Sequence, residues 1–369
     1  MSNGCESRRE IEAGGQPQAP RRYLSPEGRL VRELPPFAHE GGGIVALYRA
    51  MALTRIFDEK AVALQRTGRL GTFASSLGQE AVSVGVASAM RKADVFIPSF
   101  REQGGQLVRG VTPEELLSYW GGDERGSDFA VPREDFPVSI PVASHVPHAV
   151  GIAMAFQIRA EPRVAVCVFG DGATSKGDFY EALNMAGVWQ LPAVFVVTNN
   201  QWAISIPRAK QTAAETLAHK AVAAGIASQQ VDGNDVIAVR AAASEAIERA
   251  RRGGGPMLIE ALTYRLADHT TADDAHRYRS DEEVTAHWPD EPIARLRAYL
   301  FATGAWSKAD EDALLATCRD RIDAAAAAVE SAAPPSLADI FEYVYDELPA
   351  DLVRQQAGAA KAPRGGGNA

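Results

Sequence analysis

Apolar residues recur three and four positions apart over long segments of the chain, which is the spacing of an amphipathic helix. The segment from Gly43 to Thr67 has this spacing and is followed by Gly68, a typical helix stop, and a second helix is predicted at about 79–90. Beyond it, short runs rich in β-branched residues alternate with helical stretches. The predicted strands cover 164–169, 193–197 and 256–262, and the predicted helices cover 178–190, 212–224 and 235–252. This alternation predicts an α/β fold, a parallel sheet with helices on both faces.

The two ends of the chain lack this regular pattern. Residues 1–38 are rich in Gly, Pro, Arg and Glu without a helical or strand period, and the last residues have a similar composition. We therefore predict a mobile N-terminal arm (1–38), one α/β domain (39–350) and a mobile tail (351–369). Within the domain, an Ala-rich helix is predicted at about 292–331 and a last short helix near 336–347.

Charge and cysteine content narrow the classes of partner and compartment. The chain carries 38 basic and 47 acidic side chains, a net charge of −9 at neutral pH, which argues against nucleic acid or an anionic membrane as partner. No apolar run is long enough to span a bilayer, and the first residues lack the apolar core of a secretion signal, so we expect a cytoplasmic protein. The odd number and wide spacing of Cys5, Cys167 and Cys318 favour reduced thiols over a disulfide frame or a zinc site.

The most informative stretch, GDGATSKGD, begins at Gly170, directly after a predicted strand, and leads into a helix. Small residues there let the backbone approach an anion at the positive end of the helix. A dinucleotide fingerprint requires a third glycine where this chain has Ser175, and the Gly-Lys-Ser/Thr of a P-loop is absent. Neither of these two phosphate sites fits the residues.

A third interpretation uses the next predicted strand. Twenty-six residues separate Gly172 from Asn199, and the strand ends in Asn199-Asn200-Gln201-Trp202. In a βαβ unit the chain returns beside the first loop, at the carboxyl edge of the sheet, so Asp171 and Asn200 would face each other. Their side-chain oxygens and the backbone carbonyl of Trp202 are ligands that suit Mg²⁺, with two phosphate oxygens and a water completing an octahedron.

Gly-Asp-Gly, 26 residues and Asn-Asn together resemble the thiamine-diphosphate motif. The longer string GDGATSKGDFYEALNMAGVWQLPAVFVVTNNQWAISIP is similar to the α subunit of the heterotetrameric 2-oxoacid dehydrogenases, of the pyruvate and branched-chain types, and the resemblance covers about residues 43–350. It implies the thiamine-diphosphate-binding fold, thiamine diphosphate and Mg²⁺ as cofactors, and a cofactor site that includes Gly170, Asp171, Gly172, Ala173, Asn200 and Trp202.

The same resemblance assigns roles to residues outside the motif. Phe100-Arg101 is similar to a Tyr-Arg pair that contacts the diphosphate, although Phe100 lacks the hydroxyl. The segment containing Ile140 and Val142 resembles the one whose backbone carbonyl, here that of Ile140, holds the aminopyrimidine and whose apolar side chain, here Val142, supports the bent cofactor. Residues 264–274 resemble a loop that closes over the cofactor.

In that loop His269 is the expected catalytic residue, which also helps hold the diphosphate, and Arg265 is expected to assist. Thr72 stands where relatives commonly have phenylalanine, so the substrate pocket is expected to be wide, with Phe73 as the nearest aromatic to line it. His145 and His148 are three apart on a predicted helix, but no third metal ligand has fitting spacing, so packing or surface roles are favoured over a metal site.

The resemblance also implies partners and a reaction. In this family a β subunit supplies the glutamate that activates the cofactor, so we expect an α2β2 heterotetramer that passes its acyl group to a lipoylated dihydrolipoyl acyltransferase. Pyruvate is the expected small 2-oxoacid substrate. The alternatives are a branched-chain acid, 3-methyl-2-oxobutanoate, or acetoin, and, from a different class, a non-catalytic binding protein that kept the fold.

Overall fold

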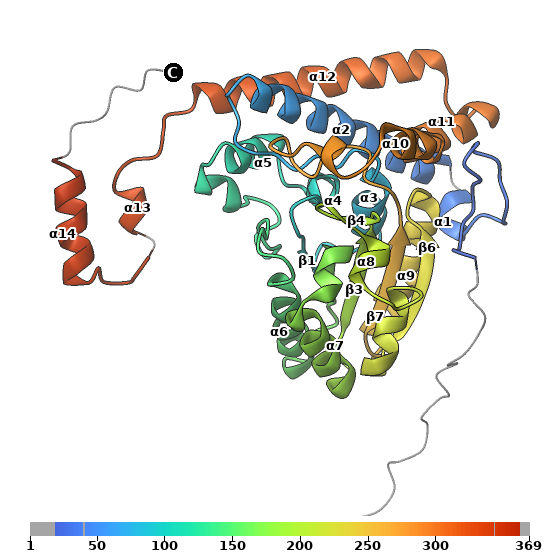
Figure 1. Cartoon of the computed structure of the whole chain (residues 1–369), viewed down its shortest axis with the longest axis horizontal. Coiled ribbons are helices and arrows are strands. Elements are labelled where there is room, and N and C mark those ends of the chain that lie inside the picture. Colours follow the sequence, from blue (N-terminus) through green and yellow to red (C-terminus); the bar gives the residue numbers. More distant parts are fainter. Residues whose placement is uncertain (1–18, 40, 343, 362–369) are drawn as a thin grey trace, which may run out of the picture. The chain divides into compact units, whose positions relative to one another are not determined.

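The computed structural model describes residues 19–39, 41–342 and 344–361 (Figure 1). These residues form two compact units, the first ending at Ala326 and the second beginning at Ala327. The sheet and the candidate site belong to the first unit. The second holds the end of α12 (Lys308–Ser331) and two short helices, α13 (Asp339–Glu342) and α14 (Ala350–Ala359). None of the helices in these described ranges combines the length and apolar character that a membrane crossing requires.

Five parallel strands form the main sheet, in the order β1 (Val95–Ile97), β2 (Ala165–Gly170), β3 (Ala193–Asn199), β7 (Met257–Leu262) and β6 (Ala227–Asp232). The three strands predicted from the sequence are the central ones, β2, β3 and β7. Central parallel strands are buried on both faces and are therefore mostly apolar, which makes them visible in the sequence. The predicted α/β fold with a parallel sheet is confirmed.

Helices cover both faces of this sheet, as predicted (Figure 1). On one face, Cys167 and Phe169 of β2 share a core with α6 (His145–Ile158) and α7 (Gly177–Trp189). On the other face, Val166 and Val168 share a core with α3 (Glu80–Ser88) and α9 (Val236–Arg251). Successive residues of β2 thus alternate between the two cores, as the geometry of a strand requires.

A second helical layer packs on α3 and α9 and contains α2 (Gly41–Arg66) and α11 (Pro292–Ala302). The remaining short elements of the described first unit are α1 (Pro36–His39), α4 (Gln103–Arg109), α5 (Pro113–Trp120), β4 (Trp202–Ala203), β5 (Ile206–Pro207), α8 (Arg208–Gln211) and α10 (Asp281–His287), with 3-10 helices at Glu124–Ser127, Asp171–Ser175 (η2), Ala218–Ala224 (η3), Ala275–Arg277 and Trp288–Asp290.

Three of the predicted helices were wrong in extent. The predicted helix 212–224 is only the 3-10 helix η3, and polar contacts hold its first turn: the Ala218 amide donates to Glu260 at 2.9 Å and Lys220 donates to the carbonyl of Thr174 at 2.8 Å. The predicted helix 292–331 is two helices, separated at Gly304, whose φ of 69° ends α11. Of the predicted helix 336–347, the described residues show only α13.

Both edge strands, β1 and β6, escaped prediction. β1 has only three residues, and β6 has the mixed sequence ASQQVD with its first four residues only half-buried. β1 is buried throughout but too short for a recognisable run, whereas the partly buried β6 carries a weaker apolar signal than the central strands.

The predicted arm contains a packed segment. Tyr23 and Leu24 are buried and belong to the same core as α2 and α11, because their backbone amides donate to Asp235 at the start of α9. Residues 1–18, the rest of that predicted arm, lie outside the described residues. In the predicted tail, α14 is helical to Ala359, and residues 362–369 also lie outside the described residues.

Candidate active site

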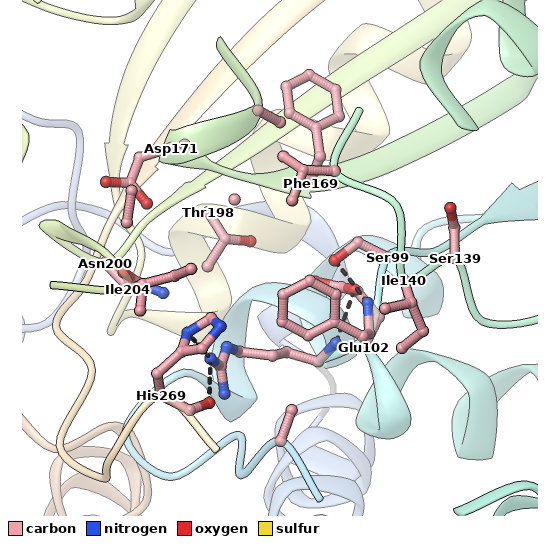
Figure 2. A pocket seen from close by; sticks show the side chains of 18 of the residues that line it. Ser99, Glu102, Ser139, Ile140, Phe169, Asp171, Thr198, Asn200, Ile204 and His269 are labelled. Carbon is pink, nitrogen blue, oxygen red and sulfur yellow. Dashed lines mark hydrogen bonds between the residues drawn. The ribbon is translucent and has the colours of Figure 1, made fainter. Parts of the chain in front are cut away.

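The carboxyl ends of β2 and β3 bring the two halves of the motif together. The strands are hydrogen-bonded neighbours, and their register pairs Gly170 with Thr198. After β2 the chain enters η2 at Asp171, and after β3 it continues into Asn200. Asp171 and Asn200 are only 2% and 5% exposed, and both line one cavity, on the same side of it (Figure 2). The structure therefore places these two side chains at one site, as their spacing predicts.

The cavity has a volume of about 740 Å³ and is assembled from widely separated segments of the chain. Most of the residues proposed from the sequence line it: Phe100, Arg101, Ile140, Val142, Gly170, Asp171, Gly172, Ala173, Asn200, Trp202 and His269. Two proposed residues, Phe73 and Arg265, do not.

Phe73 was expected to line the substrate pocket, and this expectation was wrong. Its ring is fully buried and packs edge-on against Phe57 and Trp120, with ring centroids 6.3 and 5.1 Å apart. The neighbouring residues Thr72 and Ala74 line the cavity instead. Successive side chains of a non-helical segment point to opposite sides, so the aromatic ring faces the core when its neighbours face the cavity.

Asp171 is the acidic group of the candidate metal site. Gln211 donates its side-chain amide to Asp171 Oδ2 at 2.8 Å. Burial raises the pKa of the Asp171 carboxyl above its ordinary value, and the hydrogen bond from Gln211 opposes that rise. A divalent cation at this position would favour the charged carboxylate.

Asn200 and Trp202 offer the other two oxygens. The backbone amide of Trp202 donates to Asn200 Oδ1 at 3.2 Å, and Asn200 Nδ2 donates to Gln79 Oε1 at 2.9 Å. The carbonyl of Trp202 accepts a hydrogen bond from Arg265 at 3.3 Å. Each oxygen accepts one hydrogen bond and retains a second lone pair for a cation. No group of three or more His, Cys, Asp or Glu side chains forms a metal site in the described chain, so a cation here would depend on this mixed oxygen set.

Two glycines shape the turn after β2. A Cβ atom at Gly172 would lie 2.9 Å from the Cβ of Ala203, so the turn and the loop after β3 approach too closely for a side chain there. A Cβ at Gly170 would meet nothing within 4 Å. Because Gly170 also lines the cavity, its missing side chain leaves room for a ligand beside the backbone.

Two arginines hold His269 in its neutral form. Arg101 donates to His269 Nδ1 at 2.9 Å and to the His269 carbonyl at 2.6 Å, and a nitrogen of Arg265 lies 3.4 Å from the same Nδ1. A guanidinium can only donate, so Nδ1 is unprotonated and the ring proton is on Nε2. Burial, with the two arginine charges, lowers the pKa of His269 to about 3. His269 can therefore donate a hydrogen bond from Nε2 near neutral pH.

Arg101 is the buried cation of the cavity. In the described chain its guanidinium donates to the backbone carbonyls of Ser75 and His269 and to the imidazole, not to a carboxylate. Burial, and next the charge of Arg265, lowers the pKa of Arg101 to about 10. Phe100 packs edge-on against His269, with ring centroids 5.9 Å apart. A buried guanidinium without a paired carboxylate favours an anionic ligand in the cavity.

Arg265 lies outside the cavity lining and holds neighbouring residues in position. It is fully buried and donates to the carbonyls of Trp202 and Ile204 at 3.3 and 2.8 Å and to the hydroxyl of Tyr278 at 2.8 Å. It therefore holds the loop after β3 in place, whereas direct contact with a ligand in the cavity was expected.

Ile140 and Val142 form an exposed apolar edge of the cavity, with 50% and 47% of their surface accessible. Apolar side chains at the open side of a cavity indicate a surface that a ligand or another chain covers.

Several lining residues escaped the sequence analysis as site residues, among them Glu102, His145 and Gln79. Glu102 is buried, and its burial raises the pKa of its carboxyl to about 7. His145 was expected to have a packing or surface role. It is buried, and its Nε2 donates to the Val168 carbonyl at 3.0 Å. Gln79 contacts Asn200 as described above. Among these three residues, only Glu102 had a signal in the sequence, because it directly follows the predicted site residue Arg101.

Comparison with known proteins decides the family. Residues 48–338 match the family described as "Dehydrogenase E1 component". The chain belongs to this family. The chain is similar to the 3-methyl-2-oxobutanoate dehydrogenase subunit alpha of Mycobacterium tuberculosis, with 43% identity over 356 residues, 96% of this chain and 94% of the relative.

Relatives with another name are similar over nearly as much of the chain. The pyruvate dehydrogenase E1 component subunit alpha of Mycoplasma pneumoniae is 40% identical over 311 residues, 84% of this chain and 87% of the relative. The protein of the same name from Staphylococcus aureus is 37% identical over 335 residues, 90% of each chain. Membership in this family makes the chain a component of a thiamine-diphosphate-dependent 2-oxoacid dehydrogenase, and it confirms the resemblance found in the sequence.

The residues present fit this cofactor. Arg101 is a buried cation without a paired carboxylate, His269 is a neutral donor, and the backbone at Gly170 is open to the cavity. These groups suit a diphosphate, and Asp171 with Asn200 suits the divalent cation that would accompany it.

Proposed function

We propose that this chain is the α subunit of a pyruvate dehydrogenase, which decarboxylates pyruvate oxidatively and transfers the acetyl group to the lipoyl group of a dihydrolipoyl acyltransferase. Its cofactors are thiamine diphosphate and Mg²⁺. The observation that carries the proposal is the placement of Asp171 and Asn200 at the carboxyl edge of the sheet, in one cavity with Arg101 and His269. The pyruvate dehydrogenase relatives, 37–42% identical, support this choice of substrate.

In this proposal each group has a physical task. Asp171, Asn200 and the Trp202 carbonyl hold Mg²⁺, which neutralises part of the diphosphate charge. Arg101 and the Nε2 proton of His269 bind diphosphate oxygens, and Ile140 and Val142 contact the aminopyrimidine end. When bound, thiamine diphosphate supplies the electron sink that decarboxylation of a 2-oxoacid requires. The protein binds, orients and excludes water.

A β subunit completes the proposed enzyme. The exposed apolar edge at Ile140 and Val142 supports a covering chain, and the names of the relatives describe α subunits. We infer an α2β2 heterotetramer with the cofactor between the two kinds of chain.

A branched-chain 2-oxoacid is the second candidate substrate. Thr72, rather than the aromatic ring of Phe73, lines the cavity, which leaves more room than an aromatic wall would. The mycobacterial 3-methyl-2-oxobutanoate dehydrogenase subunit is 43% identical over 96% of this chain.

Steady-state rates of the complete enzyme separate these two candidates. The chain is co-purified with its β subunit and assayed with pyruvate and with 3-methyl-2-oxobutanoate, using ferricyanide as electron acceptor. We expect kcat/KM to be about tenfold or more higher for pyruvate, the discrimination that a few methyl groups provide. An equal or higher value for the branched acid would overturn the choice of pyruvate and leave the cofactor assignment intact.

A further inference from the structure

Gln79 occupies a position that the functions assigned above do not explain. It precedes α3, is only 4% exposed and lines the cavity. Its side-chain oxygen, Oε1, accepts the hydrogen bond from Asn200 Nδ2 at 2.9 Å. Its side-chain nitrogen, Nε2, is buried and has no hydrogen-bond partner among the described residues.

The orientation of this amide follows from its neighbours. The Trp202 backbone amide can only donate, so the atom of Asn200 that it contacts at 3.2 Å is the oxygen. The other atom, Nδ2, therefore faces Gln79 and donates to it, which makes the contacted atom of Gln79 its oxygen. The Gln79 nitrogen is consequently the unpaired atom, and an unpaired buried N–H costs stability unless a ligand accepts from it.

Two other glutamines do not share both features. Gln211, which contacts Asp171, donates its amide to Asp171 and to the Ile206 carbonyl, so its nitrogen is already paired. Gln106 has unpaired amide atoms but does not line the cavity. Gln79 alone among these three combines a contact to a candidate metal ligand with an unpaired donor at the cavity.

We propose that Gln79 is a further cofactor-binding residue, which orients the Asn200 amide through Oε1 and donates from Nε2 to an oxygen of the diphosphate. This inference rests on the proposed function of the site. Because Oε1 holds Asn200 Nδ2, the Asn200 oxygen is directed away from Gln79, and the lone pair that Trp202 does not use remains available to the cation. The single side-chain amide of Gln79 thus contacts both Asn200, the proposed metal ligand, and the diphosphate.

Two substitutions separate its two contacts. Gln79→Met keeps the length of the side chain and removes both contacts. Gln79→Glu keeps an acceptor for Asn200 but removes the donor, except when the new carboxyl is protonated. Gln355→Glu makes the same chemical change at an exposed residue of α14 that does not line the cavity, and serves as the matched control.

The readout is the dissociation constant of thiamine diphosphate with Mg²⁺, measured by calorimetry on the complete α2β2 enzyme without substrate. We expect Gln79→Met to raise this constant about tenfold or more, the effect of losing a hydrogen bond to a charged group. We expect Gln79→Glu to do the same at about pH 8 and to recover several-fold by about pH 6, because a protonated carboxyl next to an anion can donate again. Gln355→Glu should bind as the wild type does.

Several outcomes would overturn the inference. Binding by both Gln79 variants within about twofold of the wild type would show that Gln79 does not contact the cofactor. If Gln79→Glu binds thiamine diphosphate more weakly than the wild type by a factor that does not change with pH, Gln79 Nε2 does not donate to the cofactor. If Gln79→Met fails to fold, the pH dependence of Gln79→Glu relative to the wild type still decides. Failure of the wild type to bind thiamine diphosphate would instead contradict the proposed function itself.

Discussion

His145 and His269 line the same cavity, and burial holds both in the neutral form. Burial lowers the pKa of His145 to about 4 and, with the nearby arginines, that of His269 to about 3. In an unfolded chain a histidine titrates near pH ~6.5. Between these values the unfolded chain binds more protons than the folded one, so each histidine lowers the stability of the fold as the pH falls below about 6.5.

Replacing His145 with glutamine removes one of these titrations, because glutamine can still donate to the Val168 carbonyl. As the pH falls from about 6 to 4.5, the free energy of unfolding of the wild type should decrease relative to that of His145→Gln by up to ~1.4 kcal/mol per pH unit. Urea denaturation of both proteins at a series of pH values measures this difference. A difference that is constant from about pH 8 to 5 would contradict a lowered pKa.

At this scale the sequence predicted the residues whose positions are set by strand register. Asp171 and Asn200 follow two adjacent strands, so their spacing alone placed them together. It did not predict side-chain direction within a loop, which is why Phe73 was expected to line the pocket near Thr72. Nor did it predict Gln79, whose role depends on a contact between residues 121 positions apart.

Among the elements, α9 depends on one buried carboxylate at its start. Asp235 Oδ1 accepts from the amides of Ile237 and Ala238 at 3.0 and 3.3 Å, and Oδ2 accepts from the amides of Tyr23 and Leu24 at 2.6 and 2.8 Å. One side chain therefore caps the helix and fastens the N-terminal segment to it.

Asp235→Ala leaves these four amides without their acceptor, in a position that is only 1% exposed. We expect the free energy of unfolding to fall by ~2–4 kcal/mol, the combined effect of a lost cap and buried unpaired donors. Asp123→Ala removes the cap of a short surface 3-10 helix and should cost below about 1 kcal/mol. Equal losses in the two variants, measured by urea denaturation, would show that Asp235 is an ordinary surface cap.

The same contacts explain which elements could be predicted. Central strands and long amphipathic helices bury continuous apolar surface, so β2, β3, β7, α2 and α9 are visible in the sequence. Elements held by polar contacts across the fold are not visible, as η3 shows: its position depends on Glu260 and Thr174. For the same reason the packing of Tyr23 and Leu24 escaped prediction.

On the scale of the whole molecule, the cavity places a cation, a neutral donor and hard oxygen ligands at one edge of the sheet and leaves an apolar edge open. These features suit a diphosphate with its cation. The substrate is determined less closely, because Ile140 and Val142 leave one apolar edge of the cavity exposed. In the proposed enzyme the β subunit covers this edge.

The most direct test of this account is the affinity of the α2β2 enzyme for thiamine diphosphate with and without Mg²⁺, for the wild type and for Asp171→Asn. The substitution keeps the size of the side chain and removes its charge, and Asp178→Asn, in the first turn of α7, is the control. We predict that the wild type and the control bind only with Mg²⁺, and that Asp171→Asn weakens binding about a hundredfold or more. Equal binding by wild type and Asp171→Asn, or binding by the wild type that is independent of Mg²⁺, would contradict the account.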